Sequence, residues 1–300
     1  MRRMLTLLLT LVAMLAFAGN SLLCRLALQH TAIDAASFTS VRLLSGAIVL
    51  WLVVQMRLRW QQRQPGSSGA VPQAIAPSAG SWGSALALFA YAAAFSYAYF
   101  SLTAATGALL LFGMVQVTMI GVGLWRGERL GLRQSIGIGC AVAGLVGLLL
   151  PGLSAPPLRG AVLMLVAGVA WGIYSLRGKA AGDPTAVTAG NFLRAIPMAL
   201  LLSLLALPWL SLDRAGTWYA IASGALASGV GYAVWYTALR GLAATSAATV
   251  QLSVPVIAAI GGAVFLNEAF TLRLALASVA VLGGVALVIL KPGIAPESRG

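Results

Sequence analysis

Few side chains in this sequence could carry out acid–base or metal chemistry. Its 300 residues include six Asp and Glu residues and one His. All seven lie at the ends of apolar runs, in the connections or in the C-terminal tail: His30, Asp34, Glu128, Asp183, Asp213, Glu268 and Glu297. Catalysis by paired acids and bases needs such groups close together at a protected site. We therefore expect no catalytic residue, no metal site and no cofactor.

Amide side chains inside apolar runs are better candidates for a functional site. Asn20, Gln116 and Gln251 each lie within such a run, and Ser253 follows Gln251 closely. A carboxamide in hydrocarbon is costly unless it bonds a partner or faces a wet cavity. We predict that these four residues face a substrate cavity, with hydrogen bonds between helices as the alternative.

Aromatic residues divide into two groups by their depth in the runs. Those at the ends fit the aromatic belt of a membrane protein and are Trp82, Trp125, Trp209 and Trp218. The deeper ones are predicted to line a substrate path, with the same belt as the alternative, and are Tyr91, Phe95, Trp171, Tyr174 and Trp235.

Arg42 stands inside an apolar run, as does Arg194. An arginine at that depth can extend towards the headgroups, bond to helix carbonyls, or meet an anionic substrate. Arg42 is therefore a candidate substrate ligand, and the structural roles stay open.

Two prolines interrupt apolar runs and could act as hinges. Pro255 follows Gln251 and Ser253, and Pro197 follows Arg194. Proline frees backbone carbonyls, and broken helices near the middle of the bilayer often mark transport sites. A static kink is the alternative at both positions.

The composition is that of a membrane protein. Hydrophobic residues make up 60% and charged residues 8% of the chain, and the mean hydropathy is +0.94. Soluble domains carry roughly 25% charged residues. The net charge of +13 lies in clusters between apolar runs, which is typical of membrane orientation signals. We expect a lipid bilayer as partner and no nucleic acid.

Ten apolar runs have lengths suited to a membrane span, which needs roughly 20 residues as a helix. They cover residues 5–28, 36–56, 82–102, 105–125, 132–150, 159–177, 187–207, 216–237, 243–265 and 271–290. Lipid cannot satisfy free backbone groups, so we predict an all-α integral membrane protein of ten transmembrane helices.

The chain contains an internal repeat. Residues 98–150 align without a gap on residues 238–290 at an offset of 140, with Glu128 on Glu268. Upstream the offset is 152, which places Arg42 on Arg194. Sequence repetition of this kind indicates a duplicated unit. We predict one five-helix repeat in residues 1–150, with a linker at 61–80, a second repeat in 158–291, and a tail at 292–300.

The basic residues predict the orientation. Of 19 Lys and Arg residues, three lie in or beside the spans and three in the loops of one side, which leaves thirteen on the other. Lys and Arg are enriched on the cytoplasmic side, so both termini and the 61–80 linker are predicted to be cytoplasmic. An odd number of helices per repeat then makes the two repeats inverted.

Residues Gly139, Ala143 and Gly147 form a face of small side chains in the run at 132–150. Such faces let helix backbones approach closely. We expect this face to pack within the chain, with a homodimer contact as the alternative.

The sequence resembles the EamA-type drug/metabolite transporter superfamily. The resemblance rests on Phe38-x-x-x-Arg42, on Gly127-Glu128-Arg129-Leu130, and in the second repeat on Pro255 and Asn267-Glu268. The first repeat departs from the second at Val115, which aligns with Pro255. The resemblance implies an exporter of small metabolites in a bacterial inner membrane.

The spans carry arginines and no acidic residue, so a purely cationic substrate would lack a counter-charge. We expect a secondary active transporter of small zwitterionic or anionic metabolites, such as amino acids or their derivatives, working by alternating access. An enzyme is not expected. The alternatives are a non-transporting membrane assembly subunit or a lipid scramblase.

Overall fold

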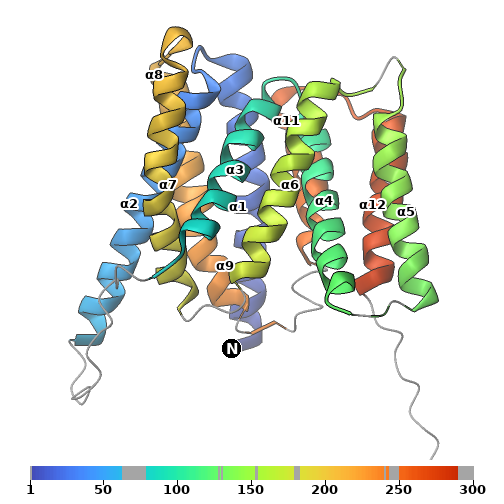
Figure 1. The fold of residues 1–300 in the computed structure, drawn as a ribbon, viewed down its shortest axis with the longest axis horizontal. Coiled ribbons are helices and arrows are strands. Elements are labelled where there is room, and N and C mark those ends of the chain that lie inside the picture. The colour runs from blue at the N-terminus through green and yellow to red at the C-terminus, as the bar shows by residue number, and fades with distance from the viewer. Residues whose placement is uncertain are drawn as a thin grey trace, which may run out of the picture.

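Every regular element in the described part of the chain is a helix (Figure 1). The structure is a computed structural model that describes residues 2–62, 79–127, 129, 131–152, 155–178, 183–239, 241–242 and 250–289. The helices in the first half are α1 (Arg2–His30), α2 (Ala35–Gln62), α3 (Trp82–Tyr99), α4 (Ala104–Trp125) and α5 (Leu132–Leu149). Those in the second half are α6 (Leu158–Gly178), α7 (Pro184–Leu205), η1 (Leu207–Trp209), α8 (Arg214–Ile221), η2 (Ala222–Val230), α9 (Gly231–Leu239), α11 (Ser253–Leu266) and α12 (Leu272–Ile289).

Seven of these helices are long and apolar enough to cross a membrane: α1, α2, α4, α5, α6, α7 and α12. Their outward faces carry large apolar side chains such as Leu7, Leu201 and Val279, which are more than half exposed. Such a surface belongs in lipid rather than in water. The chain is thus an all-helical integral membrane protein, while the count of ten spans stays a prediction.

Helices of the first half pack mainly against helices of the second. α2 packs on α7, α3 on α6, α4 on α6, and α5 on α12, while α1 packs on α9 and α11. In Figure 1, α5 and α12 stand together at one edge of the bundle, and α2 and α8 lie at the opposite edge.

The backbones of α5 and α12 lie so close together that some positions between them have no room for a side chain. A Cβ at Gly137 would lie 2.5 Å from the carbonyl oxygen of Gly284, and a Cβ at Gly144 would lie 2.8 Å from the Cβ of Ala280. Nothing lies within 4 Å of a Cβ built at Gly139 or Gly147. The expectation that the Gly139 face packs within the chain is therefore wrong, because α5 turns its other face to α12.

The predicted span at 216–237 consists of three helical segments, α8, the π-helix η2 and α9. The segment η2 contains only Ala, Ser, Gly, Leu and Val and approaches α2 very closely. A Cβ at Gly224 would lie 2.1 Å from the Arg42 carbonyl oxygen. The absence of a side chain at Gly224 thus lets η2 lie directly on α2 beside Arg42.

The two prolines have different effects on their helices. Before Pro255, a turn at Leu252 separates the helical residues 250–251 from α11, and the Ser253 hydroxyl donates to the Val250 carbonyl at 2.7 Å. Helix α7 continues through Pro197.

Most of the 61–80 linker, residues 63–78, and the 292–300 tail lie outside the described residues.

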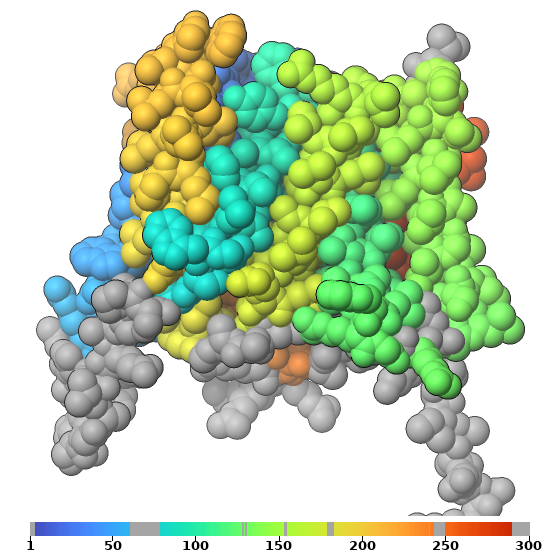
Figure 2. Space-filling model, viewed as in Figure 1, coloured from blue at the N-terminus to red at the C-terminus, as the bar shows by residue number. Residues whose placement is uncertain are grey.

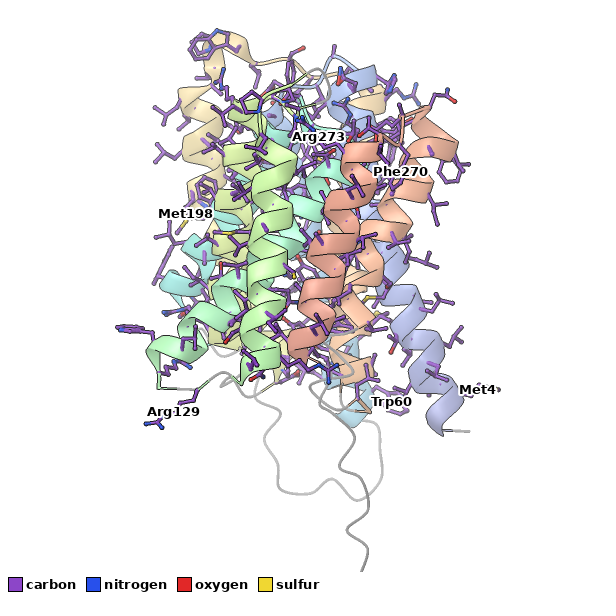
Figure 3. The ribbon with its side chains drawn as sticks, turned by 90° about the vertical axis from the view of Figure 1, so that its right-hand side faces the viewer. Met4, Trp60, Arg129, Met198, Phe270 and Arg273 are labelled. Carbon is purple, nitrogen blue, oxygen red and sulfur yellow. The ribbon has the colours of Figure 1, made fainter. Side chains whose placement is uncertain are left out.

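The two ends of the bundle can be told apart in Figure 3. Met4, Trp60 and Arg129 lie at one end, and Phe270 and Arg273 lie at the other. We call the first the Met4 end and the second the Arg273 end.

Candidate functional site

A small cavity lies where helices of the two halves meet. It is lined from α1, α3, α4, α6, η2 and α9 by Phe17, Asn20, Ser21, Tyr91, Phe95, Leu111, Phe112, Trp171, Ala227, Ser228 and Tyr232. Its volume is about 20 Å³, which is room for a water molecule. Figure 2 shows the face over α8, α3 and α6, where side chains of neighbouring helices meet without an opening. All of the lining residues except Trp171 are buried, so the cavity is small and largely enclosed in this conformation.

A hydrogen-bond network joins α1, α2, α3 and η2 beside this cavity. The Arg42 Nη2 atom donates to the Tyr91 hydroxyl at 3.0 Å, and the Asn20 Nδ2 atom donates to the same hydroxyl at 3.4 Å. The Ser223 hydroxyl donates to Asn20 Oδ1 at 2.6 Å. Buried networks of this kind fix side-chain positions when their members are satisfied.

Arg42 itself is almost completely buried, with 2% of its surface exposed. Its guanidinium carbon lies 5.2 Å from the Tyr91 ring centroid and 4.8 Å from that of Phe95. These cation–π contacts offset part of the cost of burying the charge. No ion pair to Arg42 occurs within the described residues, and its Nη1 atom has no hydrogen-bond partner there. The Nη1 atom, at the edge of the guanidinium plane, is therefore a donor without a partner in the described structure.

Aromatic rings continue from the cavity into both halves of the molecule. The Trp171 ring lies 4.8 Å from that of Tyr91, 5.3 Å from that of Tyr232, and 5.3 Å from that of Tyr174. The ring centroids of Phe17 and Trp235 lie 5.9 Å apart. Tilted and edge-on pairs at these distances are favourable, so the rings form one connected wall.

The structure brings together most of the predicted site residues. Asn20, Tyr91, Phe95 and Trp171 line the cavity. Arg42 contacts Tyr91 and Phe95. The ring of Tyr174 contacts that of Trp171, and the ring of Trp235 contacts that of Phe17, so each contacts a lining residue.

Three other predicted residues do not line the cavity. Gln116 is buried in α4, and Gln251 and Ser253 lie half-buried at the break before α11. Pro255 instead lines a second, apolar hollow of about 250 Å³ on the outer surface between α11 and α12.

Several lining residues were missed from the sequence, notably Phe17, Ser228 and Tyr232. Tyr232 could have been found, because it lies three residues before Trp235 and so on the same helix face. Phe17 and Ser228 carry no such signal, since each resembles the ordinary apolar or small residues around it.

Both ends of the bundle are held closed by polar contacts between the halves. At the Arg273 end, Arg25 Nε lies 2.9 Å from Glu268 Oε1. At the Met4 end, Arg177 Nε donates to the Ser84 hydroxyl at 3.1 Å, and the Ser81 amide donates to Asn191 Oδ1 at 2.9 Å. Glu128, the repeat partner of Glu268, lies outside the described residues.

Metal-binding side chains are dispersed. No three His, Cys, Asp or Glu residues come together in the part of the chain that the structure describes. The candidate site is therefore built from arginine, amide, hydroxyl and aromatic groups.

Comparison with known proteins identifies the family. Residues 158–290 match the model of the EamA-like transporter family. The chain is 58% identical to "Uncharacterized protein PA1977" of Pseudomonas aeruginosa over 95% of this chain and 94% of that protein. It is 25% identical to "Uncharacterized transporter YoaV" of Bacillus subtilis over 53% of this chain and 57% of that protein.

A solved structure shares the fold of this chain. The one titled "Crystal structure of protein" has a TM-score of 0.62 and 19% identity, and covers 94% of this chain and 96% of its own. At that identity the likeness concerns the fold alone. The family match over the second half places residues 158–290 of this multi-pass membrane protein in the EamA-like transporter family.

Proposed function

We propose that the chain is a secondary active transporter that exports small zwitterionic or anionic metabolites by alternating access. The observation that carries this proposal is the small cavity between the two halves, beside a buried arginine that has no carboxylate partner among the described residues. A transport site is expected at such an interface. An anionic group on the solute would supply the missing counter-charge.

We also propose that the two halves are inverted five-helix repeats, residues 1–150 and 158–291. The pattern of helix contacts supports this. α1 packs on α9 and α11 as α6 packs on α3 and α4, while α2 pairs with α7 and α5 with α12. The offset of 140 carries the bounds of α5, Leu132–Leu149, onto those of α12, Leu272–Ile289.

The small cavity has no room for a metabolite, so transport requires opening at one end at a time. Opening at the Arg273 end would separate Arg25 from Glu268, and opening at the Met4 end would separate Arg177 from Ser84. The break before Pro255 is the proposed hinge in the second half. Pro197, inside the continuous helix α7, is the proposed second one.

The proposed location is a bacterial inner membrane, with the Met4 end and both termini cytoplasmic. The greater number of basic residues predicted for that side supports this. Trp60→Cys and Phe270→Cys in a Cys140→Ser background can be probed in intact cells with an impermeant thiol reagent. The other cysteine, Cys24, is buried. We expect labelling at position 270 only, and labelling at position 60 alone would reverse the orientation.

The direct test of the function is a solute screen with the purified chain in liposomes. Accumulation or counterflow of a small anion or zwitterion is the expected result. Movement of fluorescent phospholipid without solute transport would instead support a lipid scramblase. Absence of any transport until a second protein is added would support an assembly subunit.

A further inference from the structure

Several polar side chains at or beside the cavity have hydrogen-bond donors without a partner in the described structure. Ser228 lines the cavity, is 1% exposed, and its hydroxyl has no partner in the described structure. The Arg42 Nη1 atom is likewise without a partner. The Tyr91 hydroxyl accepts from both Arg42 and Asn20, which leaves its own proton for another acceptor.

No carboxylate lies beside these donors in the described structure, and the acceptors near them are neutral oxygens. Asn20 Oδ1 accepts the short hydrogen bond from Ser223. The acidic residues that the structure describes, Asp34, Asp183, Asp213 and Glu268, lie outside the helices. A ligand ammonium group would therefore find no carboxylate beside Arg42.

The aromatic wall offers no better position for a positive charge. A ring face can bind a cation, but the faces of Tyr91 and Phe95 nearest the network already carry the Arg42 guanidinium. A second positive charge in the same buried volume would be repelled, because the interior screens charges weakly. The remaining lining, which includes Phe17, Trp171 and Tyr232, suits an apolar or aryl group.

We infer that the substrate class of this site is organic monocarboxylates with an apolar or aryl body and no ammonium group. Arg42, Tyr91 and Ser228 are the specificity-determining donors for the carboxylate. Charge-assisted hydrogen bonds to a carboxylate are the strong ones in proteins. This inference rests on the proposed function, since it takes the cavity as the transport site, and it narrows the substrates from anions and zwitterions to anions.

Four probes of nearly equal size test whether the site prefers an anion, a zwitterion, a cation or a neutral molecule. 3-Phenylpropanoate is an anion at pH 7, L-phenylalanine a zwitterion, phenethylamine a cation and 3-phenylpropanamide neutral. Each would be tested for binding to the purified protein by the shift in its thermal unfolding midpoint, and for competition with labelled 3-phenylpropanoate in liposomes. We expect 3-phenylpropanoate to bind at least about tenfold more tightly than the other three, the equivalent of one lost charge-assisted hydrogen bond.

Variants test the named donors. Ser228→Ala is expected to weaken 3-phenylpropanoate binding about three- to tenfold without lowering the unfolding midpoint, because its hydroxyl has no partner to lose. Ser96→Ala is the matched control, since Ser96 is a buried serine on α3 that bonds the Ala92 carbonyl and does not line the cavity. Arg42→Gln is expected to abolish the preference for the anion over the amide.

The outcomes separate this inference from the proposed function. Binding of L-phenylalanine or phenethylamine as tight as that of 3-phenylpropanoate would overturn the monocarboxylate assignment. An unchanged affinity in Ser228→Ala together with an unchanged preference in a folded Arg42→Gln variant would also overturn it. If the wide solute screen moves other solutes while none of the four probes binds, the inference fails and the transporter function stands. If no solute moves at all, both fail.

Discussion

Arg25 and Glu268 form an ion pair between the two halves of the chain, with Nε and Oε1 2.9 Å apart. Arg25 also donates to the Tyr99 carbonyl at 3.0 Å, and Glu268 Oε2 accepts from the Ala104 amide at 2.7 Å. Both side chains are mostly buried. The pair therefore joins the end of α1 to the connection between α3 and α4 and to the residues between α11 and α12.

Glu268→Gln should lower the stability of the folded protein by about 1–3 kcal/mol, because it removes the charge from a mostly buried, hydrogen-bonded pair. Thermal unfolding in detergent measures this. Asp213→Asn is the control, since a partly exposed Asp that caps α8 is replaced by an equally good N-cap.

A double variant separates the pair from its surroundings. If the two residues act together, Arg25→Gln added to Glu268→Gln should cost less than the sum of the two single changes. A fully additive result would show that each side chain acts through its carbonyl or amide contacts alone.

Asp34 should make stability depend on pH at the Arg273 end. Partial burial alone would raise the pKa of Asp34, but hydrogen bonds from Ser211, Ser37 and Ala36 outweigh it and hold the pKa below its ordinary value. A lowered folded-state pKa stabilises the protein above about pH 4, and this contribution is lost as the pH falls through the folded value.

Asp34→Asn tests this link. Asn can still cap α2 through one oxygen, but its amide nitrogen cannot accept the Ser211 N–H, which now donates to Asp34 Oδ2 at 3.0 Å. We expect a lower unfolding midpoint at pH 7 and a smaller difference from the parent protein below about pH 4. A difference that stays constant across this range would contradict the assignment.

The α5 glycines offer a matched pair of substitutions on one helix. Gly137→Ala would place a methyl group 2.5 Å from the Gly284 carbonyl oxygen, so the two backbones would have to separate. Gly139→Ala meets nothing within 4 Å and should gain about 0.5–1 kcal/mol from reduced backbone entropy. Opposite shifts in unfolding midpoint are therefore expected, and equal shifts would contradict the described helix face.

Alanine substitutions should rank the candidate site residues by their distance from the cavity. Asn20→Ala and Trp171→Ala are expected to lower transport in liposomes at least about tenfold, because each removes a group that lines the cavity. Gln251→Ala should have a smaller effect, since Gln251 does not line it. Loss of transport in Gln251→Ala alone, with folded yield unchanged, would place the site at the break before α11.

The long helices that the structure describes largely coincide with apolar runs predicted from the sequence, because an apolar segment at membrane depth can satisfy its backbone groups as a helix. The sequence also picks out four residues that line the cavity, Asn20, Tyr91, Phe95 and Trp171. Polar or aromatic side chains deep in an apolar run need a bonding partner or a cavity. Helix rotation is harder to predict. Gly137 and Gly139 lie on nearly opposite faces of α5, and both fit a small-residue pattern.

The π-helix η2 was not predicted because its cause is tertiary. Gly224 can approach Arg42 only after α2 and η2 have come together. Ser228 then faces the cavity from a segment whose residues all resemble ordinary packing residues. Gln251 is predicted as a site residue because it is a carboxamide within an apolar run, and Ser253 because it follows Gln251 closely. Neither reason establishes closeness to the cavity.

The backbone contact between Gly137 on α5 and Gly284 on α12 affects how motion should be measured. Two helices in contact through their main chains can slide very little, since interiors are close-packed. This pair contains one helix from each half, so in the proposed alternating access the moving bodies would not coincide with the first and second halves of the chain. Spin labels on α5 and α12 would therefore give an invariant reference distance, against which labels on α1 and α6 report displacement.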